Sequence, residues 1–290
     1  MTREEFRSFI KEKGVVLLDG GTGSCLRKRG MPAGICTEKW VYEHPDVIAQ
    51  LQQEYADAGS QIIYAPTFSA NRISLENMGL SDWIEELNHA LVRRTAEQVG
   101  DRVLIAGDLS TTGKPMEPYG PMTYDGLMEI YKEQISMLAE AGADLLVAET
   151  LLSLDEALVV CDAARAVCDL PLLVSFTCEG DGNLYFGGTV FEAASALEAM
   201  GVDAVGVNCS VGPDQLEAVI RKLHETVSIP VVAKPNAGMP TITQTGEAIY
   251  SMGEEEFANS VLHLVECGAS IVGGCCGTTP DYIRNLKKSL

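Results

Sequence analysis

Three cysteines in the second half of the chain have the residue type and the setting for metal chemistry. Cys209 ends the apolar run DAVGVNC, Cys275 ends the run ASIVGGC, and Cys276 follows directly. Three thiolates suit Zn²⁺, which prefers soft sulfur ligands in a tetrahedral arrangement. Three protein ligands would leave the fourth position open, which is typical of a catalytic rather than a structural zinc site.

The same cysteines could instead be inert buried thiols. Free cysteine is among the most buried residue types, and adjacent cysteines are not a common zinc spacing. Gly273, Gly274 and Gly277 favour the metal interpretation, because they permit the unusual backbone turn that two neighbouring ligands need. Residue spacing alone leaves both interpretations open. The cysteines without assigned chemistry are Cys25, Cys36, Cys161, Cys168, Cys178 and Cys267.

Two acidic residues also stand at the ends of apolar runs. Asp19 follows VVLL, and Glu149 follows DLLVA. An unpaired buried carboxylate is costly, so Glu149 should contact a cationic side chain or a bound ligand. The ordinary alternatives are a helix cap for Asp19 and a structural ion pair with a neighbouring Lys or Arg for Glu149.

The elements that must position these residues form a repeating pattern. Short apolar runs alternate with helix-length segments, and the runs span residues 15–21, 61–67, 102–108, 144–150, 171–177, 203–209, 229–235 and 269–275. Continuous Val, Ile and Leu runs are typical of strands buried on both faces of a parallel sheet. Eight such units predict an α/β fold, a single (β/α)8 TIM barrel over residues 1–290, with a doubly wound sheet as the alternative.

A barrel of this kind carries its active-site groups at the C-terminal ends of its strands. Strands six and eight would be separated only by the seventh, so Cys209 can meet Cys275 and Cys276 at one rim. The third run is followed by a long loop, residues 109–126, which is rich in Pro, Gly and Tyr. This loop could cover part of the barrel mouth or be an ordinary surface loop.

The motifs at the ends of the runs resemble those of the homocysteine S-methyltransferase family. The segments DGGTG, VNCSVGP, KPNAGMP and GGCCGTTP occur in this order, and PTFSANR and GDLSTTG fit the second and third strand ends. The resemblance is closest to the homocysteine-binding module of cobalamin-dependent methionine synthase and covers residues 14–286. Pro66 departs from the pattern, because an Asn is common at that position.

The resemblance implies a zinc site at the C-terminal face of the barrel. One Zn²⁺ per chain would be bound by Cys209, Cys275 and Cys276, which are also the expected catalytic residues. Asn236 is expected to fill the fourth position when substrate is absent.

The resemblance also implies a pocket for the amino acid that accepts the methyl group. Asp19 and Glu149 are expected to bind the ammonium group of L-homocysteine. Thr67, Ser69, Asn208 and Asn236 complete the set of expected substrate-binding residues.

The reaction implied by this resemblance is methyl transfer to the thiolate of homocysteine, which gives methionine. The expected donor is a methyl-corrinoid on a separate protein, because the eight runs use the chain for one barrel and only about one helix follows them. No Trp stands near a strand end to form an aromatic cage for a small methylated cation. The alternatives are a small donor such as S-methylmethionine or betaine, another thiol or selenol acceptor, and a non-catalytic zinc-binding sensor or partner subunit.

Composition excludes other kinds of partner. The chain has 41 acidic and 21 basic residues, a net charge of −20, and such a surface repels nucleic acid and anionic lipids. No apolar run approaches the ~20 residues that span a bilayer. The opening segment MTREEFRSFIKEKG predicts a polar amphipathic helix rather than a signal peptide. We therefore expect a cytoplasmic protein, in which thiols stay reduced.

Overall fold

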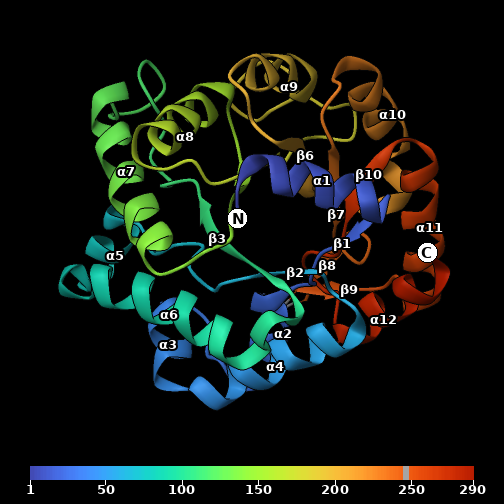
Figure 1. Cartoon of the computed structure of the whole chain (residues 1–290), viewed down its shortest axis with the longest axis horizontal. Helices are drawn as coiled ribbons and strands as arrows, with labels where there is room; N and C mark the ends of the chain where they lie inside the picture. Colours follow the sequence, from blue (N-terminus) through green and yellow to red (C-terminus); the bar gives the residue numbers. More distant parts are fainter. Residues whose placement is uncertain (244–247) are drawn as a thin grey trace.

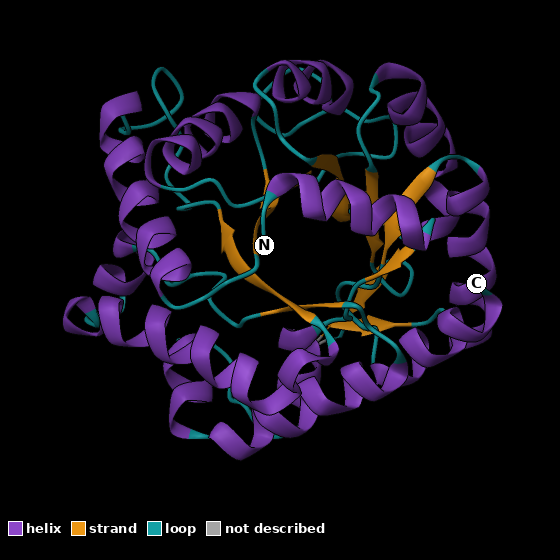
Figure 2. Ribbon diagram, viewed as in Figure 1, coloured by secondary structure: helices purple, strands orange, loops and turns teal. Residues whose placement is uncertain are grey.

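The computed structural model describes residues 1–243 and 248–290. Eight parallel strands form its centre, inside a ring of helices (Figure 2). The strands are β1 (Val16–Leu17), β2 (Ile62–Tyr64), β3 (Leu104–Ser110), β4 (Leu145–Leu151), β5 (Leu172–Phe176), β6 (Ala204–Cys209), β7 (Val231–Pro235) and β10 (Ala269–Val272). Their hydrogen-bonded order is β1-β10-β7-β6-β5-β4-β3-β2, so the predicted barrel is confirmed. Each predicted run overlaps one strand, and β3 and β4 extend beyond their runs by two residues and one residue.

The two end strands of this order, β1 and β2, close the barrel through individual hydrogen bonds. The backbone N–H of Gln61 donates to the carbonyl oxygen of Leu17 at 2.7 Å. The backbone N–H of Tyr64 donates to Oδ2 of Asp19 at 2.9 Å. Asp19 thus stabilises the junction between β1 and β2, the seam of the barrel, in addition to any role in binding.

The outer helices pack their apolar sides on the strands, and the polar residues Asn71, Thr123, Ser153 and Thr189 cap four of them through their side chains. Among the described residues, no helix has both the length and the apolarity needed to cross a bilayer. The helices are α1 (Arg3–Lys13), α2 (Thr22–Lys28), α3 (Thr37–Glu43), α4 (Pro45–Ala58), α5 (Arg72–Asn77), α6 (Ile84–Val99), α7 (Tyr124–Glu140), α8 (Leu154–Val167), α9 (Val190–Ala199), α10 (Glu217–Thr226), α11 (Glu254–Glu266) and α12 (Pro280–Ser289).

Residues along each strand alternate between the barrel interior and the side that faces the helices. On β3, Ala106 belongs to the interior cluster, and Asp108 follows it on the same side. On β7, Val232 and Lys234 stand in the same relation. The interior is therefore apolar near the N-terminal strand ends and polar near the C-terminal ends. The inward residues of this polar layer are Tyr64, Asp108, Glu149, Ser175, Asn208 and Lys234.

Helix α1 closes the opposite, apolar end of the barrel and lies across the ring of strands (Figure 1). Its inward residues Phe6 and Ile10 join the interior cluster of strand side chains. Arg3 forms an ion pair of 3.0 Å with Asp203, which is buried at the start of β6. The predicted N-terminal helix is confirmed, and its function is to seal the core.

We expect Phe6→Ala to lower the free energy of unfolding by about 3 to 4 kcal/mol, because it removes a fully buried aromatic ring from the barrel core. Urea unfolding followed by circular dichroism measures the change. The exposed Lys11→Ala on the same helix is the control and should stay within about 0.5 kcal/mol of the wild type. Equal stability of Phe6→Ala and the control would show that α1 does not seal the core.

Candidate metal centre and acidic pocket

The three predicted cysteines meet at the C-terminal end of the barrel. Cys209 is the last residue of β6, and Cys275 and Cys276 follow β10. The Sγ atoms of Cys209 and Cys276 are 3.8 Å apart, and all three Sγ atoms lie within 4.8 Å of one another. Tetrahedral zinc with Zn–S bonds of about 2.3 Å needs sulfur atoms about 3.8 Å apart. The three thiols therefore fit a zinc ion, with one position left open.

The backbone is strained where β6 delivers its cysteine. Cys209 has φ = 58° and Ser210 has φ = 48°, backbone angles that residues other than glycine rarely adopt. The Ser210 hydroxyl accepts a hydrogen bond of 2.9 Å from the backbone N–H of Cys178, which holds the turn in place. Strain of this kind persists at functional sites because the surrounding structure enforces it.

The glycines beside the cysteine pair act mainly by allowing close packing. A Cβ atom on Gly274 would lie 2.4 Å from Oγ1 of Thr278, and one on Gly21 would lie 2.4 Å from the carbonyl oxygen of Cys275. Only Gly277 of the three predicted turn glycines has a left-handed backbone, with φ = 87°. The glycine-rich segments DGG and GGCCG are thus required to fit against each other.

Hydrogen bonds within the cluster shift the pKa values of the thiols in opposite directions. Hydrogen bonds from Cys209 and then Cys275 lower the pKa of Cys276 to about 3, while hydrogen bonds to Cys275 and Cys276 raise the pKa of Cys209. Tyr250 lies against Cys276, and its hydrogen bond also favours the thiolate. Tyr250 comes from a hairpin of β8 (Pro240–Ile242) and β9 (Ala248–Tyr250), which the sequence analysis did not predict.

One cavity of about 290 Å³ contains both the cysteine cluster and the predicted carboxylates. Its chemistry is mixed, with thiols on one part of the wall and buried acidic groups on another. The residues that carry this chemistry are Asp19, Glu38, Tyr64, Phe68, Ser69, Asp108, Glu149, Lys234, Cys209, Cys275 and Cys276.

Lys234 lies between the two predicted carboxylates. Its Nζ is 3.5 Å from Oδ1 of Asp19 and 3.8 Å from Oε2 of Glu149, and it stands 4.6 Å from the centre of the Tyr64 ring. Burial lowers its pKa, but Glu149 and Asp19 outweigh burial and raise the pKa well above its usual value. The ion pair considered as the alternative for Glu149 is therefore present. The sequence feature that could have indicated this ion pair is Lys234, which ends the apolar run VVAK.

The carboxylates in this cavity are more numerous than the cations. Burial raises the pKa of Glu149 to about 7 and the pKa of Asp19 above its usual value. Burial, followed by the nearby charge of Glu149, raises the pKa of Asp108 well above its usual range. Oδ1 of Asp108 and Oδ1 of Asp19 are both buried, and neither has a hydrogen-bond partner among the described residues. Asp108 belongs to the segment GDLSTTG at the third predicted strand end, but its burial could not be read from the sequence.

The remaining predicted site residues differ in their positions. Ser69 lines the cavity, and its backbone N–H donates to Oε1 of Glu38 at 2.7 Å. Thr67 is fully buried, and its hydroxyl donates to the carbonyl oxygen of Asp108 at 2.7 Å. Thr67 thus contacts the wall of the cavity from behind.

Two asparagines brace the rim. Asn208 accepts hydrogen bonds of 2.7 Å from the N–H of Thr150 and 2.8 Å from the hydroxyl of Ser175, which joins β6 to β4 and β5. Asn236 accepts a hydrogen bond of 3.1 Å from the N–H of Cys276, so its oxygen lies beside the cysteine cluster.

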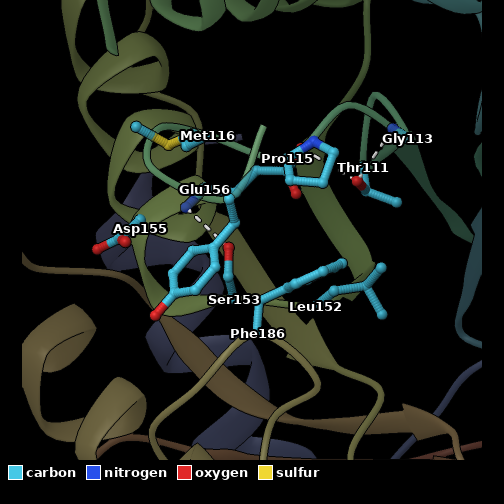
Figure 3. Close-up of a pocket in the computed structure, with 10 residues that line it drawn as sticks. Thr111, Gly113, Pro115, Met116, Leu152, Ser153, Asp155, Glu156 and Phe186 are labelled. Carbon is cyan, nitrogen blue, oxygen red and sulfur yellow. Dashed lines mark hydrogen bonds between the residues drawn. The ribbon is translucent and has the colours of Figure 1, made fainter. Parts of the chain in front are cut away.

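The loop of residues 109–126 builds a separate cavity of about 70 Å³, shown in Figure 3. Thr111, Pro115 and Met116 from this loop face Leu152 and Phe186 across it. None of the described residues that line the cavity of the cysteines belongs to this loop. The loop could have covered the barrel mouth or been an ordinary surface loop. The structure places it at the rim, where it does not cover the thiols.

Comparison with known proteins links this arrangement to one family. The sequence pattern of the family described as homocysteine S-methyltransferase matches residues 16–290. Methionine synthase from Mycobacterium tuberculosis is 31% identical over 94% of this chain, and methionine synthase from Mycobacterium leprae is 30% identical over the same share. The chain spans 24% of the length of each of these two relatives.

Two further proteins match over most of their own length. Homocysteine S-methyltransferase 4 from Zea mays is 28% identical, and the match covers 98% of this chain and 92% of that protein. The metallated form of the Escherichia coli homocysteine methyltransferase MmuM has a TM-score of 0.79 at 22% identity, over 98% of this chain and 99% of that one. The structural match shows a shared fold.

Purified protein should contain about one zinc ion per chain, and Cys209→Ser, Cys275→Ser and Cys276→Ser should each lose it, because a thiolate ligand is removed. Elemental analysis after gel filtration measures the metal content. Cys161→Ser is the control, since Cys161 is fully buried in α8 and lies outside the cluster. Full zinc content in all three cluster variants would rule out this centre.

Proposed function

The chain belongs to the homocysteine S-methyltransferase family, and we propose that it transfers a methyl group to the thiolate of L-homocysteine to form methionine. The observation that supports this most strongly is a single cavity that combines three clustered thiols with buried carboxylates. The thiols suit a metal that binds the substrate sulfur, and the carboxylates suit its ammonium group. A sensor that only binds zinc would have no use for the second feature.

We propose one Zn²⁺ per chain on Cys209, Cys275 and Cys276, with Asn236, whose oxygen accepts a hydrogen bond from the N–H of Cys276, at the fourth position when substrate is absent. When bound, zinc would keep a thiol at the open position deprotonated, and the thiolate is the reactive form of sulfur. The sulfur then attacks the methyl carbon, a C–S bond forms, and the bond to the donor breaks with its electron pair left on the donor.

The rest of the chain positions the acceptor and excludes water. Asp19 and Glu149 belong to the acidic pocket proposed for the substrate ammonium group, and Ser69 lies on its wall. Thr67 and Asn208 support this pocket through the bonds they make to neighbouring strands. Holding two reactants in line removes part of the entropic barrier to such a transfer.

We propose a methyl-corrinoid on a separate protein as the donor. Several large apolar side chains are exposed on segments that follow the C-terminal strand ends, and exposed apolar surface can serve in docking. The sequence relation to methionine synthases favours the same donor. The exposed residues on these segments are Ile35, Met78, Tyr119, Tyr124, Tyr185, Phe186, Met239, Ile242 and Ile249.

A small cationic donor such as S-methylmethionine is the second candidate. Tyr64 and Phe68 line the cavity beside several carboxylates, and this combination can attract a sulfonium or quaternary ammonium group. We also propose a cytoplasmic location. All nine cysteines are free thiols, and thiols stay reduced in that compartment.

Glu149→Gln should raise the KM for homocysteine by about 10- to 100-fold, because a hydrogen bond between charged groups is lost. Steady-state kinetics with mercaptoethanol as a second acceptor separates the two functions of the site, since mercaptoethanol has no ammonium group. In Glu149→Gln, the rate of methyl transfer to mercaptoethanol and the zinc content should stay close to those of the wild type. An equal loss with both acceptors would mean that Glu149 only supports the structure.

With zinc-loaded protein and homocysteine, we expect methionine from a methylated corrinoid protein, because the exposed apolar rim offers it a docking surface. The measurement is a panel of methylated corrinoid protein, methylcobalamin, S-methylmethionine and betaine, assayed in parallel. Rapid turnover with a small donor and none with either corrinoid would contradict the proposed donor. The proposal that homocysteine is the acceptor would still stand.

A further inference from the structure

The cavity of about 70 Å³ in Figure 3 lies beyond the C-terminal ends of β3 and β4, and we name it the outer cavity. We propose that it receives the guanidinium group of an arginine on the protein that carries the methyl donor, and that this contact holds the donor over the thiols. This inference rests on the proposed function and specifies the chemistry of the partner's docking surface.

The outer cavity and the cavity of the cysteines share the ends of two neighbouring strands. Asp108 on β3 and Glu149 on β4 line the cavity of the cysteines. Thr111 and Leu152, each three residues further along the chain, line the outer cavity. Between them, the hydroxyl of Ser110 donates to the carbonyl oxygen of Glu149 at 2.7 Å. A protein docked at the outer cavity would therefore sit beside the strand ends that border the thiols.

The carboxylate of Glu156 forms one wall of the outer cavity, although this residue is only 6% exposed. Its Oε1 accepts hydrogen bonds from the hydroxyl of Tyr131 at 2.6 Å, the hydroxyl of Thr111 at 3.1 Å and the N–H of Thr112 at 3.1 Å. Within the described part of the chain, no hydrogen bond or ion pair reaches Oε2. A mostly buried carboxylate with one free oxygen indicates a ligand that is a cation or a hydrogen-bond donor.

The charge of the outer cavity favours a cation. Asp155 lines it together with Glu156, and the described lining residues include no Lys, Arg or His. Lys114, in the adjoining loop, is exposed and is not one of these lining residues. The whole chain has a net charge of −20, which attracts a basic partner surface over a long range.

The walls of the outer cavity suit the flat guanidinium group of arginine. The aromatic residues Tyr119 and Phe186 line it, together with Met116. Arginine is more weakly hydrated than lysine and stacks on aromatic rings, so its head group can enter a partly apolar cavity and still reach a carboxylate. Pockets for whole drug-sized ligands have volumes of about 300–1,000 Å³, so the outer cavity suits one side-chain head group.

The surroundings of the outer cavity suit a protein partner. Tyr119 is 68% exposed, Tyr185 is 56% exposed and Phe186 is 39% exposed. Aromatic residues and arginine are enriched at the centres of protein interfaces, where an arginine in a pocket often supplies much of the binding energy. A second copy of this chain would bring another net charge of −20, so a separate basic protein fits the charge better.

The first test titrates N-acetylarginine methylamide into zinc-loaded protein and follows backbone amide signals by NMR. N-acetylcitrulline methylamide, which has the same shape without the charge, is the matched control ligand. The arginine compound should shift the signals of Gly113 and Phe186 and bind about 10-fold more tightly than the citrulline compound, because a hydrogen bond between charged groups forms. Glu156→Gln should remove most of this difference. Asp169→Asn, an exposed change just before β5 at the opposite end of the barrel, should retain it.

The second test separates docking from methyl transfer. With a methylated corrinoid protein as donor, Glu156→Gln and Phe186→Ala should each raise the KM for that protein by about 10-fold. With free methylcobalamin, both variants should stay close to wild type, because no protein docks. Phe186→Ala changes a partly exposed side chain and leaves the hydrogen bonds of Glu156 in place, so it tests the outer cavity even if Glu156→Gln unfolds.

Each outcome has one meaning. Equal affinity of the wild type for the arginine and citrulline compounds overturns the inference, and so does an equal loss of turnover with both donors in Phe186→Ala. Self-association of the wild type that Phe186→Ala abolishes would identify a second copy of the chain as the occupant, which also overturns it. Absence of methionine with every donor defeats the proposed function instead, while the titration still decides whether the outer cavity binds arginine.

Discussion

The buried ammonium group of Lys234 is the interaction on which the site depends. It connects β7 to Asp19 after β1 and to Glu149 on β4, so it holds three parts of the barrel at fixed distances. Without it, Asp19, Asp108 and Glu149 would share one buried space with no cation. Well-packed apolar residues often replace buried ion pairs without loss of stability. We infer that these charges persist because they bind a ligand.

The sulfur cluster and the acidic layer impose different demands on the chain. The cluster requires backbone that ordinary residues avoid, with φ = 58° at Cys209 and close packing at Gly274. In the acidic layer, Asp108 and Lys234 follow from the alternation of β3 and β7. Glu149 instead lies at an irregularity of β4, where the pairing with β5 shifts and Thr150 has φ = 62°. A rigid barrel supplies both, because its strand ends are fixed by the apolar core beneath them.

Much of the site could be predicted because strand ends are visible in the sequence. The apolar runs located all eight strands, and the order of the barrel brought Cys209 to Cys275 and Cys276. The partner of a buried charge could not be predicted, since the contact between Lys234 and Asp19 spans 215 positions and depends on side-chain direction. The contact of Tyr250 with Cys276 was missed because no motif marks the hairpin that supplies it.

The central claim is that the clustered thiols and the acidic pocket form one acceptor site. X-ray absorption at the zinc and selenium edges of zinc-loaded protein, before and after addition of selenohomocysteine, tests it most directly. We predict three sulfur neighbours at about 2.3 Å before addition and a fourth, selenium neighbour afterwards. Glu149→Gln should need more ligand to reach the same state. A zinc shell that stays unchanged at saturating selenohomocysteine, or one with fewer than three sulfur neighbours, would contradict the account.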